Sequence, residues 1–274
     1  MEQAPAETSH LLGEAEFVLA CRLIGDYAGI KLSPHKRHMV HNRLTRRLRM
    51  LRVASFADYL DQVQRDPIER EAFVNALTTN LTAFFREPHH FELLRARAAQ
   101  HRARERRPLR VWSSACSTGE EAWSIAMTLK DADCPAEVLA SDIDTEALGK
   151  AAAGVYSLER AAQLSPQQMR THWLRGTGAN EGFVSVRPSL RALVKFAQLN
   201  LQAAPWPQLE AFDVIFCRNV VIYFDREAQR RLLERFARVL RPQGLLIVGH
   251  AESFPASNRA FRACGRTAYE YLPR

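Results

Sequence analysis

The chain has 274 residues, of which 47% are hydrophobic and 25% charged, so it is long enough for a small domain joined to a larger one and has a globular composition. No run approaches the roughly 20 apolar residues of a membrane helix, and the N-terminus lacks a signal-peptide pattern, so we expect a cytoplasmic protein without membrane insertion. The formal net charge of +8 calls for an acidic partner, such as nucleic acid, anionic lipid or an acidic protein surface.

The five cysteines lie far apart, without CxxC or Cys/His ligand spacing. This scatter argues against both a disulfide framework and a structural zinc site. We therefore predict no metal, and we expect the cysteines to fill core or loop space.

The first hundred or so residues are predicted to be helical. Ser33-Pro34 is typical of a helix start, and an apolar stripe follows it, made of Val40, Leu44, Leu48 and Leu51. The opposite face of this helix would carry Lys36, Arg43, Arg46 and Arg49. Two more helices are expected near 55–63 and 69–77. We predict an N-terminal helical domain over 1–90 and a basic, polar linker over 91–107.

From residue 108 onward, short apolar runs alternate with helical patterns, which predicts an α/β domain with a mostly parallel, doubly wound, Rossmann-like sheet. Strands are expected at 109–115, 137–141, 193–198, 212–217 and 245–249. Helices are expected at 119–131 and 226–240, the second ending at Pro242-Gln243-Gly244. The glycine-bracketed alternation at 183–186 predicts a small antiparallel β subdomain, inserted over about 157–190.

The loop after the first of these strands, 115–121, is where such a sheet usually holds its cofactor. It consists of small residues, lacks the GxGxxG spacing and the lysine of a phosphate-binding loop, and carries Glu120 and Glu121. Two carboxylates would repel a diphosphate but would suit the ammonium group of an amino-acid ligand. This favours S-adenosylmethionine over a dinucleotide. The alternative is that both glutamates only stabilise the first turn of a helix.

Polar residues at the other strand ends complete the predicted site. Asp142 ends the second strand, where an acid can accept both ribose hydroxyls. Asn200 could bond the adenine edge while Leu201 packs on its face. Asn219 and Tyr223 interrupt an apolar segment facing the place where a methyl group would be presented, although Tyr223 could equally be a buried structural tyrosine.

A further polar segment lies between the two predicted domains. Asn80, Thr82 and Arg86 are spaced at i, i+2 and i+6, and Phe84 and Phe85 would anchor the segment. A donor-rich segment of this kind fits a lid over a ligand or substrate that bears a carboxylate.

Six segments in this order resemble the CheR family of chemotaxis receptor methyltransferases, over roughly residues 15–271. They are TTNLTAFFRE (78–87), ACSTGEEAWS (115–124), ASDIDTEAL (140–148), RGTG…EG.V.V (175–186), FDVIFCRNVVIYFD (212–225) and GLLIVGHAES (244–253). The resemblance implies transfer of a methyl group from S-adenosylmethionine to receptor glutamates, giving glutamyl methyl esters and S-adenosylhomocysteine.

The resemblance also implies a role for each matching residue. Asn80, Thr82 and Arg86 would contact the cofactor, Asp142 its ribose, and Asn200 and Leu201 its adenine region. Glu121, or alternatively Glu120, would bind its amino-acid part. Cys217 and Arg218 would line the site, where the residue pattern alone favours Asn219. Arg86 and Tyr223 would lie nearest the transferred methyl.

The resemblance finally implies partners. The basic helix around 34–52 would meet the acidic methylation helices of a receptor, and the inserted subdomain would dock a receptor's C-terminal peptide by strand addition. We expect a monomer. An RNA substrate would suit the charge, but no RNA-binding signature is present, so we predict no nucleic-acid partner. A different methyl acceptor or a non-catalytic signalling role is the alternative function.

Overall fold

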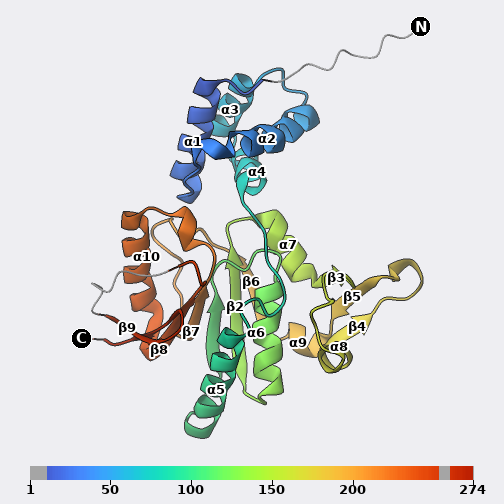
Figure 1. Cartoon of the computed structure of the whole chain (residues 1–274), viewed down its shortest axis with the longest axis vertical. Helices are drawn as coiled ribbons and strands as arrows, with labels where there is room; N and C mark the ends of the chain where they lie inside the picture. Colours follow the sequence, from blue (N-terminus) through green and yellow to red (C-terminus); the bar gives the residue numbers. More distant parts are fainter. Residues whose placement is uncertain (1–10, 253–259, 274) are drawn as a thin grey trace. The chain divides into compact units, whose positions relative to one another are not determined.

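The structure is a computed structural model that describes residues 11–252 and 260–273, and it divides into two compact units, Met1–Thr79 and Asn80–Arg274. We describe each unit by itself (Figure 1). None of the described helices combines the length and apolarity needed to cross a membrane.

The first unit is helical, as predicted. It contains α1 (Glu14–Ala28), the short 3-10 turn η1 (Pro34–Lys36), α2 (Arg37–Leu51), α3 (Phe56–Arg65) and α4 (Pro67–Leu77). The predicted stripe of α2 is the buried one, since Val40, Leu44 and Leu48 are fully buried. The Ser55 side chain caps α3 and the Asp66 side chain caps α4, so local sequence sets where both helices begin.

The second unit is built on a seven-stranded sheet with the order β6-β2-β1-β7-β8-β10-β9. The five parallel strands are β1 (Leu109–Ser113), β2 (Ala136–Asp142), β6 (Val194–Gln198), β7 (Phe212–Cys217) and β8 (Leu240–Val248). Strand β10 (Ala268–Tyr271) runs antiparallel to β8, and β9 (Phe261–Gly265) antiparallel to β10.

Helices cover both faces of this sheet, which confirms the doubly wound prediction. One core cluster joins α5 (His89–Arg104) and α6 (Glu120–Asp131) to alternate strand residues such as Val111 and Val214. The opposite cluster joins α10 (Arg226–Val239) to the intervening residues, such as Trp112 and Ile215. Successive residues of each strand therefore pack alternately into two separate hydrophobic cores, one on each face of the sheet.

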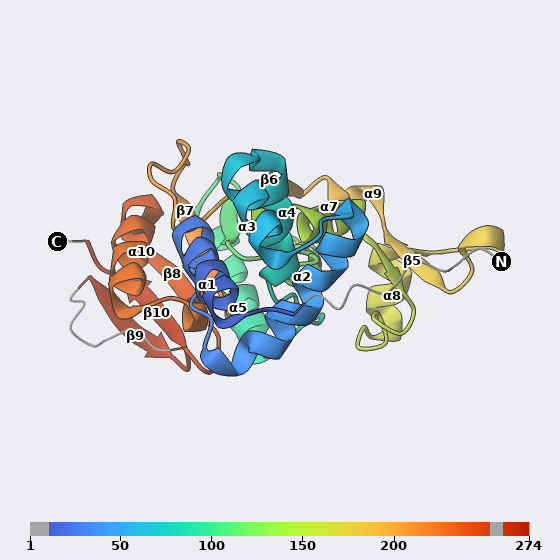
Figure 2. The ribbon, with the colours of Figure 1, turned by 90° about the horizontal axis from the view of Figure 1, so that it is seen from above.

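A second, three-stranded antiparallel sheet with the order β3-β5-β4 confirms the inserted β subdomain. Its strands are β3 (Val155–Ser157), β4 (Trp173–Arg175) and β5 (Phe183–Val186). Around them lie α7 (Thr145–Ala153), α8 (Pro166–His172), η2 (Gly178–Asn180) and α9 (Pro188–Arg191). In Figures 1 and 2, this subdomain and the strands β9 and β10 lie at opposite ends of the second unit.

Three features differ from the sequence expectations. The stretch 91–107, expected as a linker, is mostly helix α5, which buries Leu94 and Ala98, and the units divide at residue 79 rather than near 90. Helix α10 ends at Val239, and Pro242-Gln243-Gly244 lies inside β8, because Leu240 already pairs with Phe212 of β7. The hairpin β9–β10 was not predicted at all.

Candidate functional site

The carboxyl ends of β1, β2 and β7 bring most of the predicted site residues to one edge of the sheet, as expected for parallel strands. The loop after β1 and the tip of β2 are hydrogen-bonded to each other, since the backbone N–H of Ser117 donates to Oδ2 of Asp142 at 2.7 Å. Asn80 joins both: its Oδ1 accepts from the Ser117 hydroxyl at 2.9 Å, and its Nδ2 donates to Asp144 at 2.7 Å.

The loop after β1 is held in a tight conformation. Ser117 has a φ of 50°, and Gly119, which precedes α6, has a φ of 96°. A Cβ on Gly119 would lie 2.7 Å from the Cβ of Ala151 and 2.8 Å from the hydroxyl of Tyr156. The position therefore requires glycine for both its φ and its close packing. The Tyr156 hydroxyl donates to the carbonyl of Thr118 at 2.7 Å, which fixes the loop from the inserted subdomain.

Asp142 is buried at the tip of β2, with 9% of its surface exposed. Burial raises the pKa of its carboxyl to about 6, although the backbone N–H groups of Asp144 and Ser117 oppose that shift. The four lone pairs of this buried carboxylate leave room for further hydroxyl donors beside the backbone N–H groups, as a ribose contact would require.

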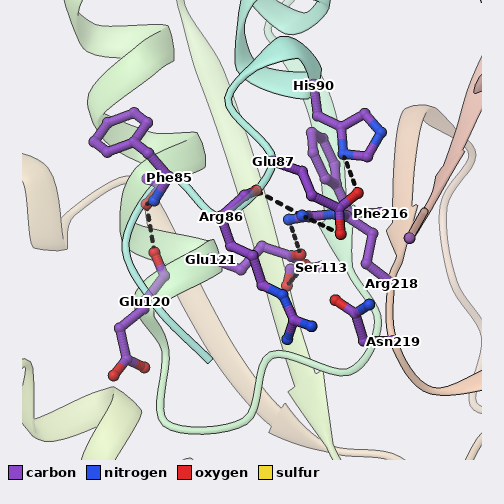
Figure 3. Close-up of polar contacts among 12 residues, drawn as sticks. Phe85, Arg86, Glu87, His90, Ser113, Glu120, Glu121, Phe216, Arg218 and Asn219 are labelled. Atoms are coloured by element: carbon purple, nitrogen blue, oxygen red, sulfur yellow. Dashed lines mark hydrogen bonds and ion pairs between the residues drawn. The ribbon is translucent and has the colours of Figure 1, made fainter. Parts of the chain in front are cut away.

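Glu121 forms a buried ion pair with Arg218 (Figure 3). Nη1 of Arg218 lies 2.9 Å from Oε2 of Glu121, and the Ser113 hydroxyl donates to Oε1 at 2.7 Å. Nη2 of Arg218 donates to the backbone carbonyl of Arg86 at 2.5 Å. Burial raises the pKa of Glu121 above its usual range, even though Arg218 and Ser113 act to lower it. One arginine therefore does not fully offset the desolvation of this carboxylate.

Glu120 faces a different partner. In Figure 3 its carboxylate points away from Arg218, and it pairs instead with Arg160 of the inserted subdomain. The Thr118 hydroxyl donates to the same carboxylate at 2.7 Å. Only 1% of the surface of Glu120 is exposed, against 7% for Glu121. The two neighbouring glutamates are thus held by two different parts of the second unit.

The segment 80–87 lies against this site and carries backbone strain. Phe85 and Glu87 have φ values of 50° and 59°, and Asn219 after β7 has one of 58°. Strained residues gathered on segments that meet at one place are typical of functional sites. Fully buried Phe84 anchors the segment by packing edge-on against Tyr156, with ring centroids 5.1 Å apart.

Arg86 and Glu87 are the charged residues of this segment, and both are partly buried. Nη1 of Arg86 donates to the carbonyl of Leu81 at 2.9 Å in an exposed setting. In Figure 3 the guanidinium of Arg86 and the side-chain amide of Asn219 point to the same side of the Glu121–Arg218 pair. Thr82 is partly exposed on the same segment.

Glu87 belongs to a cluster of side chains behind the Arg218 guanidinium. Candidate metal-ligand atoms of Glu87, His89 and His90 lie within 4.8 Å of one another. Burial, together with the positive charge of Arg218, lowers the pKa of His90 to about 3, so its imidazole is neutral. Arg218 lies 3.4 Å from Glu87, and its charge opposes a metal ion there. The Nε2 atom of His90 lies 2.7 Å from the Thr267 hydroxyl, which ties the segment to the β9–β10 turn.

Four other predicted site residues are buried or partly buried. Cys217 is fully buried in the core, where burial raises the pKa of its thiol, so its side chain is not free to line a site. Leu201 is also buried, and Oδ1 of Asn200 accepts the backbone N–H of Gln202 at 2.8 Å. Tyr223 is partly buried against the core of the α10 face.

The structure also reveals a residue with no role assigned from the sequence. Glu252, in the segment GLLIVGHAES, is buried and accepts four backbone N–H groups, three of them in the loop after β7. The signal was an acid inside a short motif, but the backbone groups that bind it cannot be read from side-chain identities.

Comparisons with known proteins agree with this arrangement. Residues 80–270 match the family described as "CheR methyltransferase, SAM binding domain", and residues 15–78 match "CheR methyltransferase, all-alpha domain". The chain is 51% identical over 266 residues to a chemotaxis protein methyltransferase of Klebsiella aerogenes, covering 94% of this chain and 90% of the relative. It is 50% identical over 264 residues to the Escherichia coli protein of the same name, covering 94% and 91%.

The second unit is therefore a methyltransferase domain that uses S-adenosylmethionine, and its residues suit that molecule. Asp142 offers a buried carboxylate for hydroxyl donors, Glu121 a carboxylate that one arginine does not fully compensate, and the loop at 115–119 small side chains for close approach. The match covers both units, and the chain belongs to the CheR methyltransferase family.

Proposed function

We propose that this enzyme transfers the methyl group of S-adenosylmethionine to glutamate side-chain carboxylates of chemotaxis receptors, producing glutamyl 5-O-methyl esters and S-adenosylhomocysteine. The observation that carries the proposal is the near-complete coverage of relatives named chemotaxis protein methyltransferases, at about half identity across both units. The net charge of +8 is complementary to an acidic receptor surface. We further propose that the enzyme works as a monomer in the cytoplasm.

The proposed acceptor sites can be tested on a purified receptor fragment. Incubation with the enzyme and S-adenosylmethionine should add the mass of one methyl group to peptides that contain particular glutamates. Replacing those glutamates by alanine should remove the modification. Methylation at residues other than glutamate would overturn the proposed acceptor while leaving the methyltransferase class in place.

We propose the following binding roles for the predicted site residues. Asp142 accepts the ribose hydroxyls, while Asn200 and Leu201 lie at the adenine region. Glu121 binds the ammonium group of the amino-acid part, because a second cation would offset the desolvation that raises its pKa. Glu120 is the less suitable of the two glutamates, since it is less exposed and turned to Arg160. Asn80, Thr82, Arg218, Asn219 and the backbone at Cys217 complete the surroundings.

Methyl transfer to a carboxylate requires little acid–base catalysis from the protein. S-adenosylmethionine supplies a methyl group on a positively charged sulfur. The acceptor glutamate, with a reference pKa of about 4.3, is already ionised at neutral pH, so no general base is needed. Rate enhancement then rests on alignment and exclusion of water, which supply on the order of 7–11 kcal/mol in well-oriented reactions. Arg86 would orient the acceptor carboxylate, and Tyr223 would donate a weaker hydrogen bond.

Removing the hydroxyl of Tyr223 tests its role directly. Tyr223→Phe should lower kcat by about tenfold while leaving the affinity for S-adenosylhomocysteine unchanged, because the lost hydrogen bond would act on the acceptor and not on the cofactor. Steady-state kinetics and calorimetry measure the two quantities. Tyr27→Phe, in α1 of the first unit, is the matched control. Unchanged turnover in Tyr223→Phe would mean that this tyrosine is only a packing residue.

The exposed basic face of α2 is the surface we propose for receptor docking. Arg46 and Arg49 are exposed on α2, and Lys36 is exposed in η1 directly before it. Arg43 is not free in the same way, because its Nη1 donates to the carbonyl of Thr78 at 2.5 Å and so caps the end of α4. The docking face is therefore smaller than the sequence pattern indicated.

Charge reversal on this face should weaken receptor methylation in a salt-dependent way. Arg46→Glu/Arg49→Glu is expected to lower kcat/KM for receptor about tenfold at low salt, and less at high salt, because screening already weakens the steering there. Arg65→Glu/Lys150→Glu is the matched control: it changes net charge equally at exposed positions elsewhere. Equal losses in both double variants would contradict docking through α2.

We also propose that the inserted subdomain can bind an extended receptor peptide by strand addition. Its two outer strands are β3 and β4, and its exposed apolar side chains include Val155, Leu174 and Phe183. An edge strand with unpaired backbone groups and nearby apolar side chains is the surface that strand addition uses.

A further inference from the structure

Glu252, just beyond the end of β8, is held by an unusual set of donors. Its Oε2 accepts the backbone N–H groups of Asn219 at 2.8 Å and Gly249 at 2.7 Å. Its Oε1 accepts those of Val220 at 2.8 Å and Val221 at 2.7 Å. Only 5% of its surface is exposed. Both carboxylate oxygens are therefore committed to the backbone, and three of the four donors are consecutive.

Three consecutive N–H groups converge on one point only in a special backbone conformation. Asn219 has a φ of 58° and Val220 a φ of −123°, so the chain turns sharply directly after β7. Such a turn forms a concave, anion-binding arrangement of N–H groups. In this protein the anion is the chain's own carboxylate, supplied from the end of the neighbouring strand.

The contact also fixes the Asn219 side chain. A Cβ on Gly249 would lie 2.5 Å from Nδ2 of Asn219 and 3.0 Å from Oε2 of Glu252. Glycine at this position thus lets the amide of Asn219 lie against the β8 backbone beside the carboxylate. The loop then continues into the 3-10 turn η3 (Val221–Tyr223), which carries Tyr223.

We propose that Glu252 is a positioning residue for methyl transfer: it fixes the loop 219–223 so that Asn219 and Tyr223 face the acceptor carboxylate. It acts through the backbone and touches neither substrate. This inference rests on the proposed function, in which that loop lies nearest the reacting atoms. A purely structural role for Glu252 would instead lower stability and leave turnover per folded molecule unchanged.

Asp213, on β7, is a matched control for Glu252. It too is a buried carboxylate, with 2% of its surface exposed, and it accepts the backbone N–H of Arg110 at 2.9 Å and two bonds from the Arg107 guanidinium. It lies at the start of β7, whereas Glu252 binds the loop after the strand's end. Substitution of Asp213 therefore removes hydrogen bonds of a buried carboxylate, as substitution of Glu252 does, but at a place remote from the site.

The test compares Glu252→Gln with Asp213→Asn in the full-length enzyme. Glutamine keeps the shape but turns an NH₂ group towards two of the four donors. Hydrogen exchange of the amides of residues 219–221 should become at least about tenfold faster in Glu252→Gln and stay unchanged in Asp213→Asn. kcat for receptor methylation should fall about 10- to 100-fold in Glu252→Gln, because misplacement of a positioned group by an ångström costs that much. Affinity for S-adenosylhomocysteine should fall by a smaller factor, since Asp142 and Glu121 stay in place.

Two results would overturn the inference. One is unchanged amide exchange at 219–221; the other is a kcat for Glu252→Gln that matches Asp213→Asn once the folded fraction is taken into account. If Glu252→Gln does not fold, Glu252→Asp replaces it, because aspartate keeps the charge but cannot reach all four donors; its kcat should lie between those of wild type and inactive enzyme. Wild-type enzyme that methylates no receptor would count against the proposed function, and the exchange measurement would still decide whether Glu252 holds the loop.

Discussion

Asp142→Asn is expected to weaken binding of S-adenosylmethionine by about 10- to 100-fold, because hydrogen bonds to a charged group contribute roughly 1.5–3 kcal/mol each. Asparagine keeps the size of the side chain but loses the charge and one acceptor oxygen, while its amide opposes a backbone N–H of Ser117 or Asp144. Calorimetric titration with S-adenosylhomocysteine measures the change.

The pH dependence of binding gives an independent check on this residue. The pKa of Asp142 is raised to about 6, so lowering the pH through this value protonates the carboxyl and removes an acceptor. Affinity should therefore fall by about tenfold per pH unit below 6 in wild type, and much less in Asp142→Asn.

The contribution of Asp142 to protein stability changes with pH in the opposite direction to its contribution to cofactor affinity. A carboxyl whose pKa is raised by burial favours the folded state when protonated, so its contribution to the free energy of unfolding decreases as the pH rises from 3.8 towards about 6.

Glu146 provides the matched control for Asp142. It is an exposed acid in the first turn of α7, four residues further on. Glu146→Gln removes the same charge from the same region and should leave affinity within about twofold of wild type. If Asp142→Asn bound the cofactor as tightly as Glu146→Gln, the ribose contact assigned to Asp142 would be wrong.

Breaking the buried ion pair should have the largest effect on stability. Arg218→Met leaves Glu121 buried without its partner, which costs roughly 3–5 kcal/mol of unfolding free energy. For a protein of this size, that loss lowers Tm by roughly 10 °C. The exposed pair Arg102–Asp133 is the control, and Arg102→Met should cost less than about 1 kcal/mol.

A double variant distinguishes the loss of the attraction between Arg218 and Glu121 from the cost of burying Glu121 without a partner. Arg218→Met/Glu121→Met removes both charges, so it should recover part of the stability lost in Arg218→Met. It should nevertheless bind S-adenosylhomocysteine poorly, because the carboxylate proposed for the ammonium group is gone. Failure to recover any stability would show that the contacts of Arg218 with the Arg86 carbonyl and with Glu87, and not the pair with Glu121, are the stabilising ones.

The sequence predicted the parallel strands well because their buried residues form short apolar runs. Every residue of β7, for example, is buried. It missed β9 and β10 because they form an edge hairpin in which Arg262, Cys264 and Gly265 are exposed, so no apolar run marks them. It misplaced the end of α10 because Pro242 and Gly244 are usual stop signals, whereas pairing with β7 already begins at Leu240.

For the site, the sequence patterns predicted which polar residues lie at the strand ends, but not which of them pair with each other. Glu121 and Arg218 are 97 positions apart, and only the fold shows that they form an ion pair. A separation of 40 positions likewise hid the pairing of Glu120 with Arg160 of the inserted subdomain. The role of Glu252 depends on backbone N–H directions, which no residue pattern carries.

The most direct test of the central claim follows labelled methyl from S-adenosylmethionine into membranes rich in chemotaxis receptors, with mild base added afterwards. We expect label on the receptor that base releases as methanol, because a glutamyl methyl ester is hydrolysed under those conditions. Label that stays bound through base treatment, or no transfer from an enzyme that binds S-adenosylhomocysteine, would contradict receptor glutamate methylation.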